Sequence, residues 1–132
     1  MRYTKYLMII AGVGGILGHA PARAAVSQDS FLLKDTGALV EICSADKSDP
    51  LYTAAINFCH GFGVGVFRVL RAVDARKSSQ PLFCLPNPMP TRNAALTAFI
   101  QWAKADSNRL TQPPEDGLAA FLSQQYPCDR NR

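Results

Sequence analysis

The chain has 132 residues, of which 48% are hydrophobic and 18% are charged, and its formal net charge is +4. This length suits one domain and excludes separate catalytic and regulatory modules. Three of the 14 basic residues, Arg2, Lys5 and Arg23, belong to an N-terminal leader, so 11 remain against 10 acidic residues, a net charge of +1. Proteins that bind nucleic acid carry a clustered excess of positive charge. No nucleic acid partner is therefore expected.

The first 24 residues have the features of a secretory signal peptide. Two basic residues precede the apolar segment Leu7–Gly18, which is too short to cross a bilayer, and Ala22–Ala24 supplies a cleavage site with small residues. We expect cleavage near Ala24/Ala25. The mature domain would then be residues 25–132, periplasmic and without membrane attachment.

Four cysteines follow this leader, at Cys43, Cys59, Cys84 and Cys128. An even number of cysteines in a short exported chain is typical of structural disulfides. Their spacing contains no Cys-x-x-Cys pair, which argues against a zinc site. Each disulfide would stabilise the domain by about 2–4 kcal/mol.

The N-terminal half of the mature chain predicts two helices. Apolar residues at helical spacing indicate the first helix over Asp29–Ala45. In the turn that follows, Asp49 precedes Pro50, which is typical of an N-cap and the first residue of a helix. The second helix, the longest, is predicted from Pro50 to about Ala75.

The C-terminal half predicts a loop and two further helices. Arg76–Pro90 is rich in serine and proline and predicts the loop. Thr91 is the expected N-cap of a third helix that reaches about Ser107, and a fourth helix opens at Pro113 and ends before Pro127. The expected fold class is all-α, a compact disulfide-tied bundle of about four helices.

Four cysteines allow three pairings. Helices that follow one another in the chain are usually neighbours in space. The end of the first helix would then meet the start of the second, and the start of the third would meet the end of the fourth. This topology favours the pairs Cys43–Cys59 and Cys84–Cys128.

The predicted second helix contains three glycines in the run Gly61–Gly65 (GFGVG), although each glycine costs a helix about 1 kcal/mol relative to alanine. We interpret Gly61 and Gly65, four residues apart, as a site of close helix packing, within the domain or across a dimer seam. A phosphate-binding loop is the alternative, but the strand that should precede such a loop is absent from the pattern.

The mature chain shows no catalytic constellation. It retains one histidine, His60, beside a cysteine that is expected to be oxidised, and its carboxylates are scattered singly. We therefore expect a binding or structural protein and not an enzyme, with no catalytic residue, no cofactor and no metal.

Three segments together resemble the Rap/Tai family of immunity proteins: Phe58–Phe62 (FCHGF) with Gly65, Cys84–Pro86 (CLP) and Tyr126–Cys128 (YPC). The resemblance covers about residues 35–128. It implies a compact helical domain, often a homodimer, that protects Gram-negative bacteria from peptidoglycan amidases delivered by type VI secretion. It further implies inhibition by occlusion of the amidase cleft.

Two polar loops at helix ends are the candidate partner-binding segments, Arg76–Pro81 and Asp106–Pro113. Arg76 and Arg109 are the candidate anchors, because arginine is enriched among residues that dominate interface energetics. A different hypothesis is a small periplasmic stress or acid-resistance chaperone, which would also be helical and disulfide-bonded.

Overall fold

The structure is a computed structural model that describes residues 25–77 and 80–128. A 3₁₀-helix, η1 (Gln28–Leu32), precedes the α-helices α1 (Thr36–Cys43), α2 (Tyr52–Asp74), α3 (Arg92–Lys104), α4 (Ser107–Leu110) and α5 (Pro114–Gln125). The described residues form no strand, so the predicted all-α class is confirmed. The predicted signal peptide, residues 1–24, lies outside the described residues.

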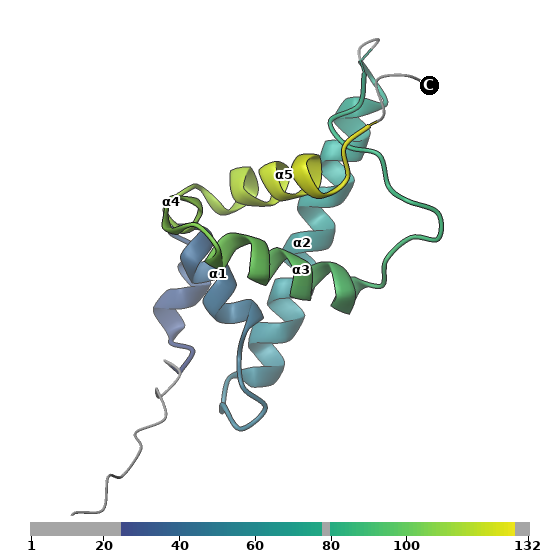
Figure 1. Ribbon diagram of the computed structural model, residues 1–132. Coiled ribbons are helices and arrows are strands. Elements are labelled where there is room, and N and C mark those ends of the chain that lie inside the picture. The colour runs from purple at the N-terminus through teal and green to yellow at the C-terminus, as the bar shows by residue number, and fades with distance from the viewer. Residues whose placement is uncertain (1–24, 78–79, 129–132) are drawn as a thin grey trace, which may run out of the picture.

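The long helix α2 organises the molecule (Figure 1). Helices α1 and α5 pack directly on α2, whereas α3 packs chiefly on α1, α4 and α5. The C-terminal end of α2 extends beyond α5, and the chain then turns back toward the bundle (Figure 1). The fold therefore consists of a bundle with one helix end that projects from it.

The predicted first helix over Asp29–Ala45 is wrong, because two short helices occupy this region. Between them, Leu33 has a left-handed backbone (φ 47°) that ends η1. The carboxylate of Asp35 then accepts the backbone N–H of Ala38 at 2.8 Å and starts α1. The N-capping preference of Asp35 outweighed the apolar periodicity that runs through both helices.

Helix α2 begins at Tyr52, two residues later than predicted. The carboxylate of Asp49 accepts the N–H of Leu51 through Oδ1 and that of Val26 through Oδ2, each at 2.8 Å. Asp49 therefore holds the turn before α2 and also fixes the start of the described chain, where Val26 is buried.

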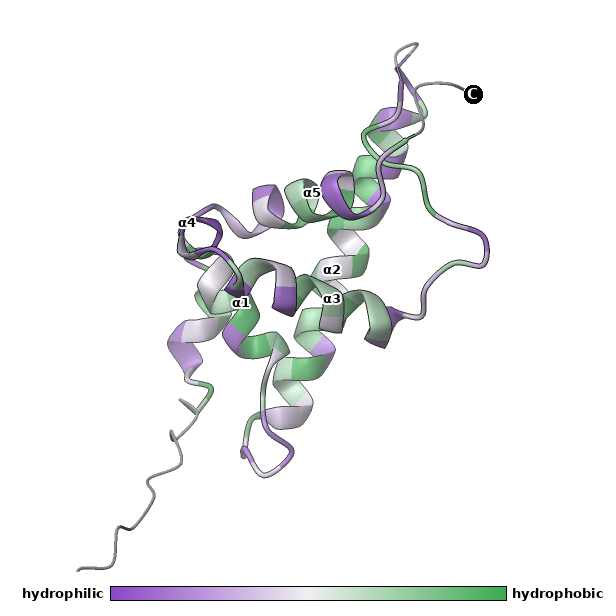
Figure 2. Cartoon of the chain, viewed as in Figure 1, coloured by the Kyte–Doolittle hydropathy of each residue, from purple (hydrophilic) through white to green (hydrophobic). Residues whose placement is uncertain are grey.

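Helix α2 is apolar over most of its length, as Figure 2 shows, yet the domain covers little of it. By length and composition alone this helix could cross a membrane, and only 11% of its most apolar window is buried. Its buried residues, Ala55 and Cys59, both lie in the N-terminal half. That half belongs to the core, and the other half leaves apolar side chains such as Val69 and Val73 exposed.

Three phenylalanines form the centre of the core, and each is at most 2% exposed. Phe99 of α3 and Phe121 of α5 meet edge to face with ring centroids 5.6 Å apart. Phe83, from the segment after α2, packs on Phe67 at 5.7 Å. Burial of each ring stabilises the fold by about 1.5–3 kcal/mol, so Phe83 anchors a segment that has no helix of its own.

Both predicted disulfides are confirmed. Cys43–Cys59 joins α1 to α2 with a Cα–Cα distance of 5.3 Å. Cys84–Cys128 joins the segment before α3 to the end of α5 with a Cα–Cα distance of 4.8 Å. The N–H of Cys84 also donates to the carbonyl of Tyr126 at 2.8 Å. As predicted, the cysteines pair because the end of α1 lies near the first half of α2, and the segment before α3 lies near the end of α5.

Among the described glycines, the tightest helix contact lies at Gly117 and not in the glycine run of α2. A Cβ on Gly117 would overlap Oγ1 of Thr36 in α1 and would lie 3.0 Å from its Cγ2. By contrast, no atom of another residue lies within 4 Å of a Cβ built on Gly61 or Gly65. Close packing of another helix of this domain against Gly61 and Gly65 is therefore wrong, and their packing across a dimer seam stays a prediction.

Candidate functional site

The two predicted anchors, Arg76 and Arg109, lie far apart. Arg76 follows the projecting C-terminal end of α2, whereas Arg109 belongs to α4 at the opposite side of the bundle (Figure 1). A single loop-sized element inserted into a partner could not present both side chains. The two candidate segments therefore form two separate surfaces.

Arg109 is occupied by contacts within the domain. Its Nη1 donates to the carbonyl of Trp102 at 2.6 Å, and its guanidinium carbon lies 4.3 Å from the centre of the Trp102 ring. Its Nε lies 3.9 Å from the carboxylate of Asp106. The guanidinium thus donates a hydrogen bond to Trp102 and also stacks on its ring. Arg109 therefore attaches α4 to α3.

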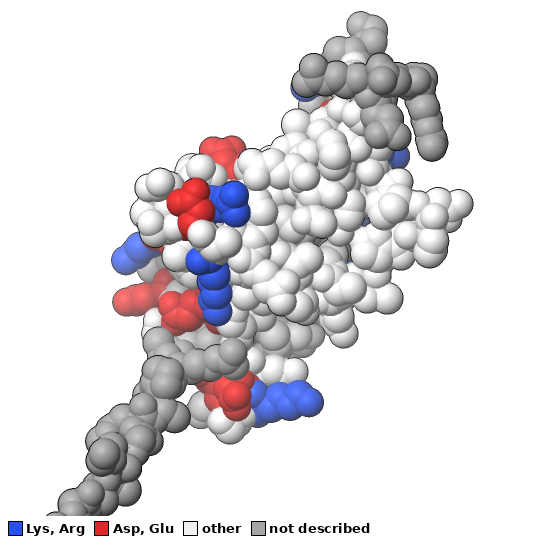
Figure 3. Space-filling model, viewed as in Figure 1, with Lys and Arg blue, Asp and Glu red and all other residues white. Residues whose placement is uncertain are grey.

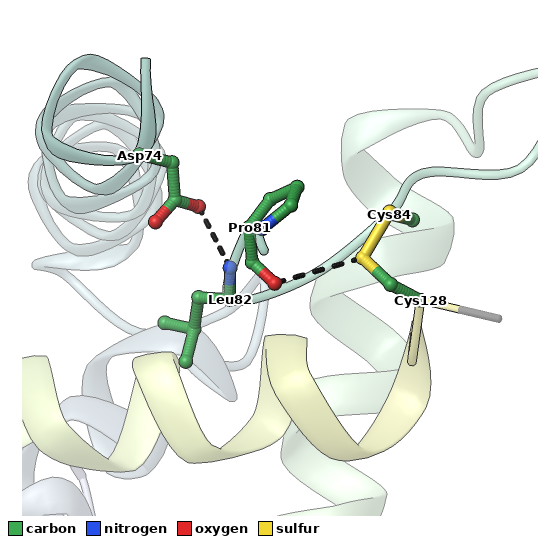
Figure 4. Close-up of a disulfide and its surroundings, with 5 residues drawn as sticks. All are labelled: Asp74, Pro81, Leu82, Cys84 and Cys128. Atoms are coloured by element: carbon green, nitrogen blue, oxygen red, sulfur yellow. Dashed lines mark hydrogen bonds between the residues drawn. A yellow bond between two sulfur atoms is a disulfide. The ribbon is translucent and has the colours of Figure 1, made fainter. Parts of the chain in front are cut away.

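We define the projecting end as residues 70–77 of α2 and its C-terminal extension together with residues 80–84. Figure 4 shows how the second part is fixed to the first and to α5. The carboxylate of Asp74 accepts the N–H of Leu82 at 3.0 Å, and the Sγ of Cys128 lies 3.7 Å from the carbonyl oxygen of Pro81. The projecting end is thereby a braced structure whose exposed residues include Arg76 and Lys77.

A second feature is a cavity of about 320 Å³, which we name the α2–α3 groove. It is bounded by residues of α2, α3 and α5, and Leu85, Met89 and Pro90 of the segment before α3 contribute to its lining. It exists because α3 packs on α1, α4 and α5 rather than closely on α2. Its apolar lining includes Val64, Phe67, Leu85, Leu96, Leu118 and the edges of Phe99 and Phe121.

The polar groups of the α2–α3 groove carry one sign of charge. The exposed Arg68 and Arg92 line it from α2 and α3, and His60 and Tyr126 complete the polar part of the lining. Among the described residues, no aspartate or glutamate lines the groove. In Figure 3 the charged side chains of the visible face lie mainly over α4, α1 and the turn between α1 and α2, whereas the area over most of α3 and α5 carries no charge. The groove is thus apolar with a cationic rim.

Gly63 is the residue of the glycine run that faces this groove. A Cβ on Gly63 would meet no atom within 4 Å, because the space beside it is the groove itself. Neither sequence-based interpretation of the glycine run, a helix-packing site or a phosphate-binding loop, predicts this groove. The sequence does contain one sign of the groove. Gly63 lies two residues from both Gly61 and Gly65, so a packing contact between Gly61 and Gly65 does not account for it.

The described residues do not form a metal-binding cluster: no three His, Cys, Asp or Glu side chains gather in them. Both disulfides leave no free cysteine to act as a nucleophile. The accessible features are instead surfaces, namely the projecting end and the α2–α3 groove. These features belong to a disulfide-bonded helical domain.

A comparison with protein families identifies the family of this domain. The model of the Rap1a immunity proteins matches residues 35–128, and the chain belongs to this family. The resemblance to the Rap/Tai immunity proteins is thereby confirmed. Such families typically consist of non-enzymatic inhibitors with an effector protein as partner, and the two disulfides suit a secreted or periplasmic protein. No curated protein and no solved structure matches the chain.

Proposed function

We propose that this protein binds a peptidoglycan amidase effector of type VI secretion in the periplasm and blocks its active cleft. Family membership supports the immunity function and the existence of an effector partner. The observation that carries the blocking mechanism is the projecting end, which combines protrusion, bracing and exposed side chains in one element.

The projecting end has the properties needed for insertion into a cleft. Arg76 and Lys77 are exposed there, and the apolar Val73 and Leu82 are 39% and 42% exposed beside them. Interfaces of this kind combine an apolar centre with arginine and a polar rim. Because the brace from Asp74 to Leu82 and the second disulfide already order this element, binding costs little additional conformational entropy.

The exposed half of α2 also supports a homodimer. Gly61 and Gly65 leave its backbone approachable, and Val69 beside them is 62% exposed. A second copy of α2 that packed on this face would bury the apolar residues that the domain leaves uncovered. In this arrangement the glycine pair keeps the role predicted from sequence, now between protomers.

The proposal is tested by co-expression with a peptidoglycan amidase effector of type VI secretion. The wild-type protein should restore growth to cells that export the amidase, and Arg76→Ala should weaken that rescue. Lys34→Ala is the matched control, since Lys34 is an exposed basic residue at the η1 end of the molecule. Rescue that Arg76→Ala and Lys34→Ala affect equally would refute the role of the projecting end. Absence of both rescue and complex would refute the immunity function itself.

A further inference from the structure

In the α2–α3 groove, apolar side chains from three helices surround a space that the described residues do not fill. Val64 and Phe67 face it from α2, Leu96 from α3 and Leu118 from α5. Beneath them lie the rings of Phe99 and Phe121, which the core holds in fixed positions. A preformed apolar space of this kind with a few polar groups at its edge is the usual form of a binding site.

The size of the groove limits what it can hold. Its volume of about 320 Å³ is at the small end of the range for ligand pockets. One large side chain fits such a space, whereas a docked helix would need a longer trough. Gly63 contributes to this volume, because any side chain on it would project into the groove.

The charge of the rim limits the occupant further. Arg68 and Arg92 form no ion pair with any described residue, and no carboxylate of the described residues lines the groove beside them. Met89, which is 65% exposed, adds an unbranched and adaptable side chain to the edge. An apolar group alone would leave both cationic groups without a partner, and a basic flank would be repelled.

We infer that the α2–α3 groove is a docking site for a segment of the effector that inserts one aromatic or large aliphatic side chain and carries a carboxylate on each side of it. The apolar side chain would fill the space beside Gly63, and the carboxylates would pair with Arg68 and Arg92. This inference rests on the proposed function only in naming the effector as the partner. It adds a second contact surface beside the projecting end.

The test uses blocked tripeptides and needs no amidase. Glu-Trp-Glu, Lys-Trp-Lys and Glu-Ala-Glu are titrated into the oxidised protein, and binding is followed through the backbone amide signals of Gly63 and Leu96 in NMR spectra. Glu-Trp-Glu should bind at least about threefold more tightly than Lys-Trp-Lys, in the range that exposed ion pairs provide. Glu-Ala-Glu should not shift these signals.

Two substitutions by leucine locate the binding. Gly63→Leu should abolish the Glu-Trp-Glu shifts because its side chain occupies the groove. Gln101→Leu is the matched control, because Gln101 is an exposed residue of α3 that lies outside the groove lining. This variant should bind as the wild type does.

Four results would each overturn the inference: no shift with Glu-Trp-Glu, equal or tighter binding of Lys-Trp-Lys, unchanged binding in Gly63→Leu, or tighter binding of decanoate than of Glu-Trp-Glu. The last would assign the groove to anionic amphiphiles. Each of these results leaves the amidase proposal standing, since growth rescue tests that proposal separately.

Discussion

Gly117 of α5 lies directly against the side chain of Thr36 in α1, and no side chain fits between the two helices at this point. Thr36 is fully buried, and its hydroxyl donates to the carbonyl of Gln112 at 3.0 Å, with the carbonyl of Pro113 at 3.2 Å. The contact therefore joins the start of α1 to the start of α5 through both packing and hydrogen bonding.

Substitution of Gly117 should destabilise the domain. Gly117→Ala forces its Cβ into Oγ1 of Thr36, and such overpacking costs about 1–3 kcal/mol, which exceeds the gain in helix propensity. Gly65→Ala, on an exposed stretch of α2, should instead stabilise a protomer by up to about 1 kcal/mol. Denaturant unfolding measures both variants. A Gly117→Ala protein as stable as the wild type would contradict the contact.

The two disulfides should contribute unequally to stability. Cys84–Cys128 spans 44 residues and Cys43–Cys59 spans 16. In the loop-entropy model, the longer loop should provide about 1 kcal/mol more. Paired Cys→Ser variants of each bridge, compared by denaturant unfolding, test this order.

Loss of the Cys84–Cys128 disulfide should also loosen the projecting end, since this disulfide links the segment that follows α2 to the residues that follow α5. The Cys84→Ser/Cys128→Ser variant should show faster amide exchange at Leu82 than the Cys43→Ser/Cys59→Ser variant does. Equal exchange in the two variants would show that the hydrogen bond from Leu82 to Asp74 suffices to brace this element.

Arg109 should behave as a stabilising residue. Arg109→Ala removes a hydrogen bond from a charged donor and a contact with the Trp102 ring, and should cost about 1–3 kcal/mol. Arg109→Lys keeps the charge but loses the planar fork, so it should recover only part of that loss. Thermal unfolding gives these values. If Arg109→Ala weakens effector binding while its stability is unchanged, Arg109 is a partner contact after all.

Export should produce a chain that begins at Ala25 with no free thiol. The anchoring of Val26 by Asp49 places this predicted start immediately before the first buried residue. Intact-mass analysis with thiol labelling of the exported protein measures both properties. A retained leader or reactive thiols would contradict the predicted compartment.

The sequence predicts the long elements of this fold well and its interruptions poorly. The periodic apolar residues of α2, α3 and α5 are sufficient to locate those helices, and the order of helix ends is sufficient to pair the cysteines. The break at Leu33 was missed because apolar spacing continues across it, while the local preference of Asp35 for an N-cap decides the backbone.

The candidate site depends on tertiary placement, which the sequence does not display. Gly63 and Leu96 are 33 positions apart in the sequence. They line one groove only because α3 packs against α1 and α5. In the same way, Gly117 resembles any isolated glycine near a helix start until α1 is placed against it. Arg109 resembles an exposed loop arginine until Trp102 lies beneath it.

The proposed blocking of an amidase effector is tested most directly by titrating the purified protein into a peptidoglycan amidase effector while peptidoglycan hydrolysis is recorded. We predict that hydrolysis stops when the binding sites of the protein equal the amidase in number, and that the projecting-end variant Arg76→Ala requires a higher concentration for the same inhibition. Undiminished hydrolysis at excess protein, with no complex detected, would contradict the account.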